Sequence, residues 1–349
     1  MTPSAPALSQ DERIQLLENY DLNHNLVRYA ELLPGKSAFI DARTPGSHLK
    51  ENYCIVGEGV AENPDQPVHI LDDKGFNVGA AGQPVGIKNS LHSHTSAEIF
   101  IIFRGQFRLY WGNEGIEEAV LGPGDMISIP TNCFRGFEVV GNEYGFLFAF
   151  LGGDDSGGGV TWHPEVIREA DSHGLILLEN GSLVDTVAGH TMPEGVGKMP
   201  PLSEPEMAGF DNLTVTEMLT HVALQNDHTP TDKPFSHGSF KQYNLSGSSD
   251  NDYNFHIKSQ DGLCVFAYEM EKGGTVPLHR RNEPEVLINY SGDTLLSLIE
   301  GECQREVLLT KGDTFNLPQG IAYSLRGLRG QSMVYSAVNG NSPAQAAVV

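Results

Sequence analysis

Two long stretches of the chain consist of short, largely apolar segments separated by Gly, Pro, Asn and Asp. The first stretch begins near residue 68 and contains the segments 99–103, 106–111, 126–129, 133–140 and 146–151. The second contains the segments 265–268, 286–290, 295–299 and 305–309. Arg104-Gly105, between the first two segments, favours a hairpin. Many short strands with few helices among them predict an all-β sandwich or barrel.

Helical patterns are short. Ser9 and Glu12 have the spacing of a capping box, and an apolar stripe follows them, which predicts a first helix. A second short helix is expected over 25–33, and residues 162–170 fit one more. The Pro- and Gly-rich stretch 192–205 has no periodicity and is interpreted as part of a long connection between domains.

The chain is strongly acidic, with a formal net charge of −23 over 349 residues. Binding to phosphate groups needs basic patches, so this balance argues against a nucleic-acid partner. The length suits two domains with connections. The four cysteines form no CxxC pair, so reduced thiols in a cytoplasmic protein are expected. No apolar run has the length of a membrane span and no signal peptide is recognised, so no membrane partner is expected.

Candidate chemistry is concentrated in residues 86–105, GIKNSLHSHTSAEIFIIFRG. His92 and His94 are two positions apart, so in an extended strand their side chains point to the same face. Glu98 begins the next strand, beyond a short corner. Two imidazoles and a carboxylate on one wall suit a first-row divalent metal with open coordination positions, and Fe(II) is the usual occupant of such a set.

The second half of the chain repeats this spacing. Gly86, His92, His94, Glu98 and Gly105 are matched at the same intervals by Gly273, His279, Arg281, Glu285 and Gly292. Downstream, Gly124-Asp125, Pro130 and Arg135 are matched by Gly312-Asp313, Pro318 and Tyr323. Two independent matches of register indicate a duplicated β-barrel.

These two blocks resemble the paired motifs of the cupin superfamily, G(X)5HXH(X)3-4E(X)6G followed by G(X)5PXG(X)2H(X)3N, so the chain is similar to a bicupin. With the helical pattern of the first residues, the resemblance implies an all-β fold of two jelly-roll-like, cupin-type barrels in tandem behind an N-terminal helical arm. The expected limits are 1–66 for the arm and lead-in, 67–153 for the first barrel, 154–240 for the connector, 241–340 for the second barrel and 341–349 for a tail.

The first barrel departs from the cupin pattern at Arg135, which stands where a histidine is usual as the fourth metal ligand. The implied metal ligands are therefore His92, His94 and Glu98 alone. A guanidinium is always charged, and one directed at a dication would be costly in a barrel of low dielectric. Either Arg135 binds an anionic substrate group beside the metal, or it pairs with Glu98 and the barrel is metal-free.

The second barrel has lost two of its implied ligands. Arg281 replaces the second histidine and Tyr323 replaces the last one, while His279 and Glu285 remain. Arg281 and Glu285 can neutralise each other inside the barrel. We expect no metal in this degenerate second site.

Two functional hypotheses follow. The first is a metal-dependent enzyme, foremost an Fe(II) dioxygenase acting on a small anionic molecule, aromatic ones included. Arg135 would be its catalytic and substrate-binding cation, with Phe107 and Phe137 lining the pocket. Mn, Ni and Zn are alternatives to Fe(II), and a metal-dependent lyase, decarboxylase or isomerase is an alternative reaction. The second hypothesis is a metal-free bicupin that binds a small ligand or serves as an assembly module. A homodimer formed through sheet edges is expected in either case.

Overall fold

The computed structural model describes residues 8–72, 74–152, 159–231, 239–248, 253–259, 262–340 and 346–349. By its internal contacts the chain divides into two compact units. Leu33–Asn226 form one unit, called the first barrel below. Met1–Leu32 and Asp227–Val349 form the other, called the second barrel.

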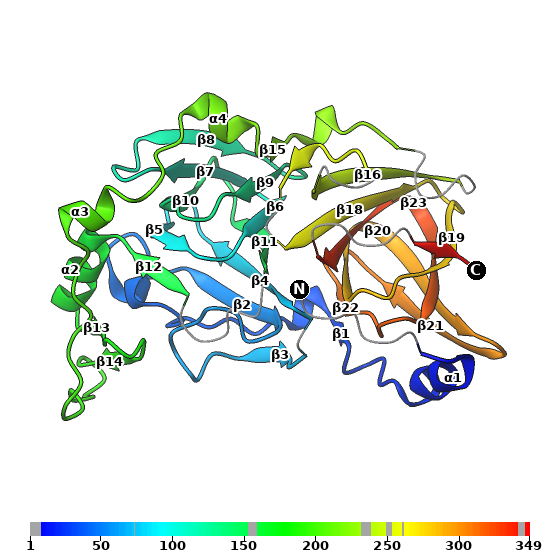
Figure 1. The fold of residues 1–349 in the computed structure, drawn as a ribbon, viewed down its shortest axis with the longest axis horizontal. Helices are drawn as coiled ribbons and strands as arrows, with labels where there is room; N and C mark the ends of the chain where they lie inside the picture. Colours follow the sequence, from blue (N-terminus) through cyan, green and yellow to red (C-terminus); the bar gives the residue numbers. More distant parts are fainter. Residues whose placement is uncertain are drawn as a thin grey trace. The chain divides into compact units, whose positions relative to one another are not determined.

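Two sheets build the first barrel (Figure 1). One has seven strands in the order β15 (Val222–Ala223), β9 (Met126–Ile129), β6 (Glu98–Arg104), β11 (Gly145–Gly152), β4 (Phe76–Gln83), β2 (Glu51–Val56) and β3 (Val68–Ile70). The other has five strands in the order β12 (Val160–Trp162), β5 (Lys88–His94), β10 (Arg135–Val140), β7 (Gln106–Trp111) and β8 (Glu117–Leu121).

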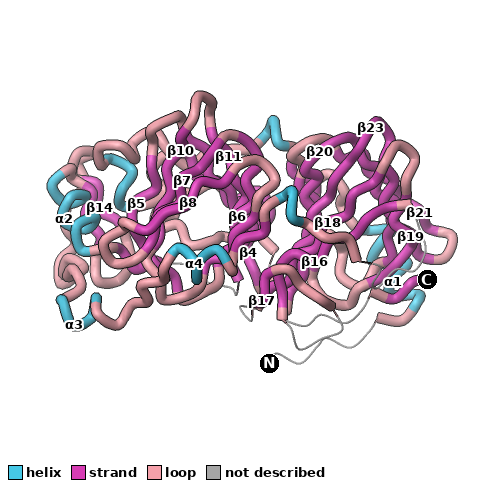
Figure 2. The backbone as a smooth tube through the Cα atoms, turned by 90° about the horizontal axis from the view of Figure 1, so that it is seen from above, coloured by secondary structure: helices cyan, strands magenta, loops and turns pink. Residues whose placement is uncertain are grey.

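The core of the first barrel lies between these two sheets, which Figure 2 shows as separate layers. Phe100, Ile127 and Leu147 come from the seven-stranded sheet, and Leu109 and Phe137 come from the five-stranded one. Their rings and branched chains interdigitate as in a β-sandwich. The alternation of apolar residues in β7 therefore has the predicted cause, because one face of the strand is buried in this core.

Segments outside the expected first barrel complete it. The 3-10 helix η2 (Ile40–Arg43) packs with α2 (Pro164–Ser172) in one apolar cluster, and β13 (Leu175–Leu177) pairs with β14 (Leu183–Asp185). The short helices α3 (Glu204–Met207) and α4 (Val215–Leu219) follow. Parts of the expected lead-in and connector thus build the first unit, and the domain limits given above stay predictions.

The second barrel contains a ten-stranded sheet, and two of its strands are long, β20 (Glu285–Glu300) and β23 (Ala322–Asn339). Its other strands are β1 (Leu26–Val27), β16 (Phe240–Gly247), β17 (Ile257–Lys258), β18 (Leu263–Met270), β19 (Thr275–Arg280), β21 (Cys303–Leu309), β22 (Thr314–Asn316) and β24 (Ala347–Val348). The 3-10 helix η3 (Gln225–Asp227) lies at the division between the units. Of the predicted tail, residues 341–345 lie outside the described residues.

The N-terminal segment packs on the second barrel. The predicted first helix is confirmed as α1 (Gln10–Asn19), with a capping box in which Glu12 N–H donates to Ser9 Oγ over 3.3 Å. The predicted second helix over 25–33 is wrong. Residues there form β1, which pairs with β22, and the 3-10 turn η1 (Tyr29–Glu31). The Asp313 carboxylate accepts from Tyr29 N–H over 3.1 Å, so the backbone is held by the sheet rather than by a helix.

Two further local predictions differ from the structure. The strands around Arg104-Gly105 are not a hairpin, because β6 and β7 lie in different sheets and the chain crosses between them at Gly105. Gly105 has a φ of 76°, and a Cβ there would come within 2.9 Å of the Gly145 backbone. The helix expected at 162–170 begins only at Pro164, because His163 caps it. Trp162 belongs to strand β12 and is paired there with His92 of β5.

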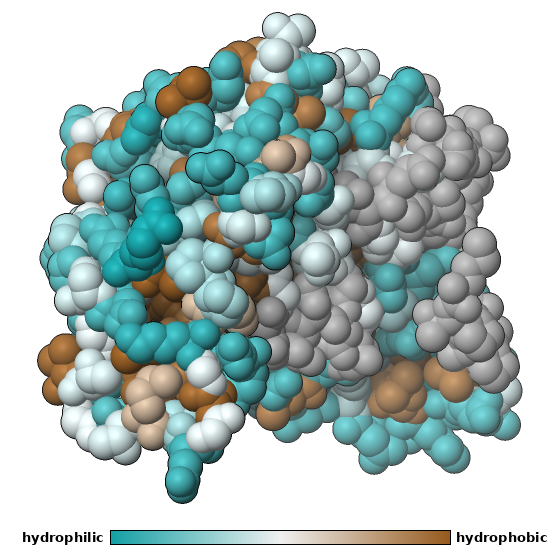
Figure 3. Space-filling model, turned by 60° about the vertical axis from the view of Figure 1, so that its left-hand side comes forward, coloured by the Kyte–Doolittle hydropathy of each residue, from teal (hydrophilic) through white to brown (hydrophobic). Residues whose placement is uncertain are grey.

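The face of the molecule in Figure 3 is mainly hydrophilic, in keeping with the acidic composition. Among the described residues, no helix combines the length and the hydropathy needed to cross a membrane. Cys54, Cys133, Cys264 and Cys303 are all free thiols.

Candidate metal centre

His92 and His94 lie at the end of β5, with their rings 5.0 Å apart between centroids. Strand β5 lies between β10 and β12, so His92 is paired with Arg135 of β10 on one side and with Trp162 of β12 on the other. These pairings hold the two histidines in place. Glu98 is the first residue of β6, in the opposite sheet. The residues His92, His94 and Glu98 are 5 %, 3 % and 5 % exposed, and one ligand atom from each lies within 4.8 Å of the others.

Backbone carbonyls fix the orientation of both imidazoles. His92 Nδ1 lies 2.7 Å from the Ser90 carbonyl oxygen, and His94 Nδ1 lies 3.3 Å from the Gly159 carbonyl oxygen. A carbonyl can only accept, so each Nδ1 carries the proton in the neutral ring and each Nε2 keeps its lone pair. Metal-binding histidines commonly donate from the second ring nitrogen in this way. The donor set is therefore prepared to bind a cation.

Arg135 lies at the start of β10 and pairs with Glu98. Both Nε, at 3.0 Å, and Nη2, at 2.9 Å, approach the same carboxylate oxygen, Oε2. The other oxygen, Oε1, lies 3.8 Å from His94 Nε2. One oxygen of Glu98 is thus used by the guanidinium, and the other faces the imidazoles. The residues present fit a metal ion held by two Nε2 atoms and Oε1, even with the ion pair intact.

Burial controls the protonation of these groups. Desolvation, assisted by the positive charge of Arg135, lowers the pKa of both His92 and His94 well below the usual range. Both rings are therefore neutral near pH 7, as metal ligands must be. Desolvation raises the pKa of the Glu98 carboxyl, and the charge and hydrogen bond of Arg135 oppose that rise.

A cavity in the first barrel opens onto His92, His94 and Glu98. The cavity has a volume of about 80 Å³. One water molecule needs roughly 10–15 Å³ by the same measure. Aromatic and polar side chains share the wall, namely Phe39, Tyr53, Phe100, Phe137 and Trp162 with Asn52, Gln66, Asn77 and Asn89. Among the described residues that line it, none is a lysine or an arginine. The cavity suits a small organic molecule.

The structure separates the residues predicted to bind substrate. Phe137 lines the cavity, whereas Phe107 is fully buried in the core between the sheets. Arg135 is only 2 % exposed and lies behind Glu98 rather than on the cavity wall. A catalytic or substrate-binding role for Arg135 stays a prediction, and in this arrangement the guanidinium acts on Glu98.

Several cavity residues were not predicted. Trp162 packs against the His92 ring with centroids 5.4 Å apart, and its Nε1 donates to the buried carboxyl of Glu62. Desolvation raises the pKa of Glu62 to about 8. The pattern His163-Pro164 is a helix start and could have placed Trp162 outside the helix. No sequence pattern marks Asn52, whose buried Nδ2 has no partner within the described structure.

Among its described residues, the second barrel shows no such donor set. Glu285 accepts hydrogen bonds from Tyr323 Oη, at 2.7 Å, and from Ser336 Oγ, and Arg281 Nε lies 3.9 Å from it. Arg281 also stacks over the Phe266 ring, and the rings of His279 and Tyr323 lie 4.2 Å apart. Arg281 and Glu285 thus lie within ion-pair distance, as the predicted neutralisation requires, and the degenerate role of this site stays a prediction.

The fold and the paired motifs define a class of protein, the bicupins. Residues 245–349 match the family model described as Cupin. No curated protein sequence matches the chain. Among solved structures, the chain is similar to the oxalate decarboxylase of Lactobacillus farciminis in its formate complex, with a TM-score of 0.59, 11 % identity, and coverage of 95 % of this chain and 89 % of that one.

Two other solved structures give the same picture. The oxalate decarboxylase of Bacillus subtilis at pH 4.6 has a TM-score of 0.56 and 12 % identity, over 93 % of this chain and 78 % of that one. Vicilin from Corylus avellana (hazelnut) has a TM-score of 0.53 and 12 % identity, over 91 % and 86 %. The chain therefore has the bicupin fold, as predicted, and its C-terminal barrel matches the cupin family in sequence.

Proposed function

We propose that this protein is a metal-dependent bicupin enzyme that cleaves a small organic acid, as a lyase of the decarboxylase type, in its first barrel. The observation that carries the proposal is the state of the two imidazoles. Each Nδ1 is turned to a backbone carbonyl, so both Nε2 atoms and Glu98 Oε1 are left for one cation beside the cavity. The donor set of two imidazoles and one carboxylate suits Fe(II), and Mn(II) accepts the same donors.

The charges of the site favour an anionic substrate. Arg135 already neutralises Glu98, so a divalent ion held there would keep most of its positive charge. Since Glu98 is the one acidic side chain among the described residues of the cavity wall, that charge would be balanced by a substrate oxyanion rather than by the protein. A bound divalent ion supplies Lewis acidity, which draws electron density from a carboxylate or carbonyl oxygen.

The chain's own residues bind and orient the rest of the substrate. Phe137 and Trp162 offer apolar faces, and the Asn52 amide offers a buried donor on the same wall. Enclosure between two sheets excludes bulk water, which strengthens each polar contact. We therefore expect a small acid with a compact apolar part.

The choice of reaction follows the fold neighbours. Two of the solved structures above are oxalate decarboxylases, which supports the lyase alternative over the Fe(II) dioxygenase that we first predicted. No observation made on the described residues favours oxygen chemistry. The homodimer and the cytoplasmic location stay predictions.

The proposal is tested by loading the protein with Mn(II) or, without oxygen, with Fe(II), and supplying a panel of small mono- and dicarboxylic acids. Carbon dioxide release without matching consumption of dioxygen is the expected result, and it should be absent in H94A. Consumption of dioxygen in step with product would return the dioxygenase hypothesis. No turnover of any acid by the fully loaded protein would contradict the lyase.

One observation favours a second candidate, a metal-free bicupin that binds a small ligand in the same cavity. That hypothesis predicts the Arg135–Glu98 ion pair, and the pair is present. The two functions differ in which side chains matter. If ligand binding and stability survive H92A but are lost in R135A, the metal-free function is correct.

A further inference from the structure

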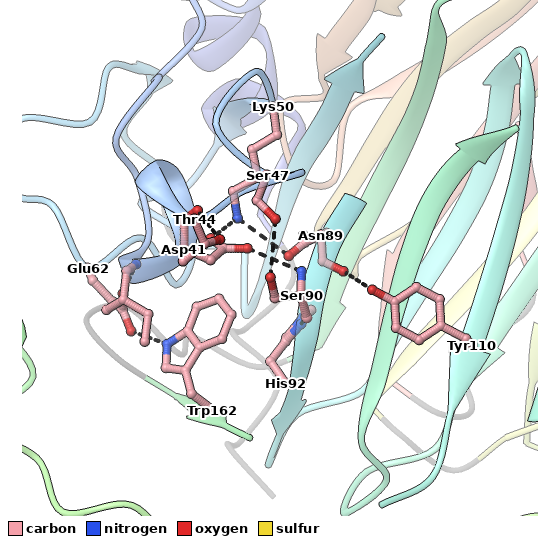
Figure 4. A network of polar contacts seen from close by, with 11 residues as sticks. Asp41, Thr44, Ser47, Lys50, Glu62, Asn89, Ser90, His92, Tyr110 and Trp162 are labelled. Carbon is pink, nitrogen blue, oxygen red and sulfur yellow. Dashed lines mark hydrogen bonds and ion pairs between the residues drawn. The ribbon is translucent and has the colours of Figure 1, made fainter. Parts of the chain in front are cut away.

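A buried ion pair lies behind the strand that carries His92 (Figure 4). Asp41, in η2, is 0 % exposed, and Lys50, just before β2, is 2 % exposed. Lys50 Nζ pairs with Asp41 Oδ1 and lies 3.5 Å from Asn89 Oδ1. Burying two charges away from water costs free energy, so a buried ion pair at this position needs a structural explanation.

The second oxygen of Asp41 reaches the backbone of β5. Asp41 Oδ2 accepts from Ser90 N–H over 3.1 Å, and Ser90 is the residue whose carbonyl accepts from His92 Nδ1 over 2.7 Å. The other side of the same peptide is also held, because Tyr110 Oη donates to the Asn89 carbonyl over 2.8 Å. The peptide between Asn89 and Ser90 is thus fixed from both sides, one residue before the carbonyl that orients His92.

The ion pair also supports the ring that packs on His92. Lys50 Nζ lies 5.1 Å from the Phe39 ring centroid and 5.8 Å from that of Trp162. The Trp162 ring in turn lies 5.4 Å from the His92 ring. A cation over two aromatic faces favours one placement of those rings. His92 is therefore held along two routes that begin at the same pair.

We propose that Asp41 is a positioning residue for His92, acting through the Ser90 peptide, with Lys50 as the counter-ion that keeps its carboxylate in place. In the metal-free protein this arrangement keeps His92 in the Nδ1–H tautomer with Nε2 available. The inference rests on the proposed function only for the use made of that nitrogen. Outer contacts of this kind typically change metal affinity by about 10–100-fold when removed.

The test compares two double variants that both lack the ion pair. D41N/K50M keeps an oxygen acceptor for Ser90 N–H, and D41A/K50M removes it. E300A, which removes a buried carboxylate from Arg13 and Arg280 in the second barrel, is the control for destabilisation alone. Y110F, which frees the opposite side of the same peptide, is a milder variant if D41A/K50M does not fold.

Two readouts are taken. Proton–nitrogen correlation spectra of the imidazole rings of the metal-free protein report the His92 tautomer, with its signal assigned by comparison with H92Q. Titration with Co(II) alone, followed by visible absorption, reports affinity. We expect E300A to match the wild type, and D41N/K50M to keep the Nδ1–H tautomer with a small loss of affinity, since it lacks the Lys50 cation over the two rings. D41A/K50M should show mixed tautomers and about 10–100-fold weaker Co(II) binding. Y110F should show the same changes to a smaller extent.

The outcomes separate the two proposals. Identical spectra and affinities for D41A/K50M and D41N/K50M, or, where D41A/K50M does not fold, a Y110F indistinguishable from the wild type, would overturn the positioning role. Failure of the wild type to bind Co(II), together with the expected tautomer change, would overturn the proposed function and leave the positioning role supported.

Discussion

The two barrels share one motif spacing, and in both of them the last motif residue contacts the motif glutamate. Arg135 is the cross-strand partner of His92, and Tyr323 is the cross-strand partner of His279. Both donate to the motif glutamate, Arg135 to Glu98 and Tyr323 to Glu285. The glutamate is therefore satisfied by protein in each barrel.

The barrels differ in the second histidine position. His94 leaves a nitrogen beside Glu98 Oε1 in the first barrel, whereas Arg281 fills the matching volume of the second and stacks on Phe266. We propose that the residue at this position, His94 or Arg281, separates a barrel that can hold a metal ion from one that cannot.

The largest effect expected from this comparison is the loss of metal binding in H94A. The first barrel then offers one imidazole and one carboxylate, too few ligands for a stable site. Metal content after loading with Mn(II) and gel filtration should fall from about one equivalent per chain to the background level. H279A, its counterpart in the second barrel, should keep the full equivalent. Loss of metal in H279A would show that the ion is bound in the second barrel instead of the first.

Removing Arg135 should be the most destabilising single change. R135M leaves the buried Glu98 without its partner, which typically costs about 3–5 kcal/mol of unfolding free energy. The matched variant R281M should cost less, because Glu285 keeps Tyr323 and Ser336. Denaturant unfolding measures both, and added Mn(II) should restore much of the stability of R135M. Equal losses in the two variants would show that the ion pairs are equivalent.

The pH dependence of stability should be steeper for the first barrel. Burial lowers the pKa of His92 and His94 well below the usual range, so the unfolded chain takes up protons below pH about 6.5 and the folded chain does not. Their contribution is complete above that pH and is lost as the pH falls. Each ring should contribute a slope of about 1.4 kcal/mol per pH unit.

The second barrel offers one matching ring, since burial lowers the pKa of His279 to about 3. For the metal-free protein between pH 7 and 5, the slope of the unfolding free energy against pH should therefore decrease about twice as much in H92Q/H94Q as in H279Q. Equal slopes in wild type and H92Q/H94Q would mean that the first-barrel imidazoles titrate in the fold with the same pKa as in the unfolded chain.

The smallest effect should come from Y323F, which removes one hydrogen bond to Glu285 and keeps the ring against His279. A hydrogen bond to a charged group contributes about 1.5–3 kcal/mol, and we expect the lower end because Ser336 and Arg281 remain. Denaturant unfolding is again the measurement. A loss of unfolding free energy as large as that of R135M would mean that the hydrogen bond from Tyr323 alone stabilises the buried Glu285.

The duplicated fold could be predicted because its signal is local. Strand side chains alternate with a period of two, so the spacing of His92 and His94 already placed the two imidazoles on one face. Glu98 does not share their wall as predicted, because it comes from β6 in the opposite sheet. That Arg281 and Glu285 can neutralise each other was expected from their opposite charges, and they lie within ion-pair distance. The strands around Gly105 were misassigned to a hairpin, because a tight turn and a crossing between sheets carry the same residues.

The surroundings of the site could not be predicted, because they depend on contacts distant in sequence. Asp41 lies 49 residues from Ser90, and Glu62 lies 100 residues from Trp162. Nothing in the pattern of residues 33–66 distinguishes a lead-in from a cavity wall. The choice of Arg135 between substrate and Glu98 is likewise a matter of side-chain conformation, and sequence spacing left both alternatives open.

Anomalous scattering from crystals grown with excess Mn(II) tests the central claim most directly. We expect one peak per chain in the first barrel, within bonding distance of His92 Nε2, His94 Nε2 and Glu98 Oε1, with Arg135 still on Oε2 and no peak between His279 and Glu285. A first barrel without a peak at saturating Mn(II), with Arg135 still paired to Glu98, would contradict it.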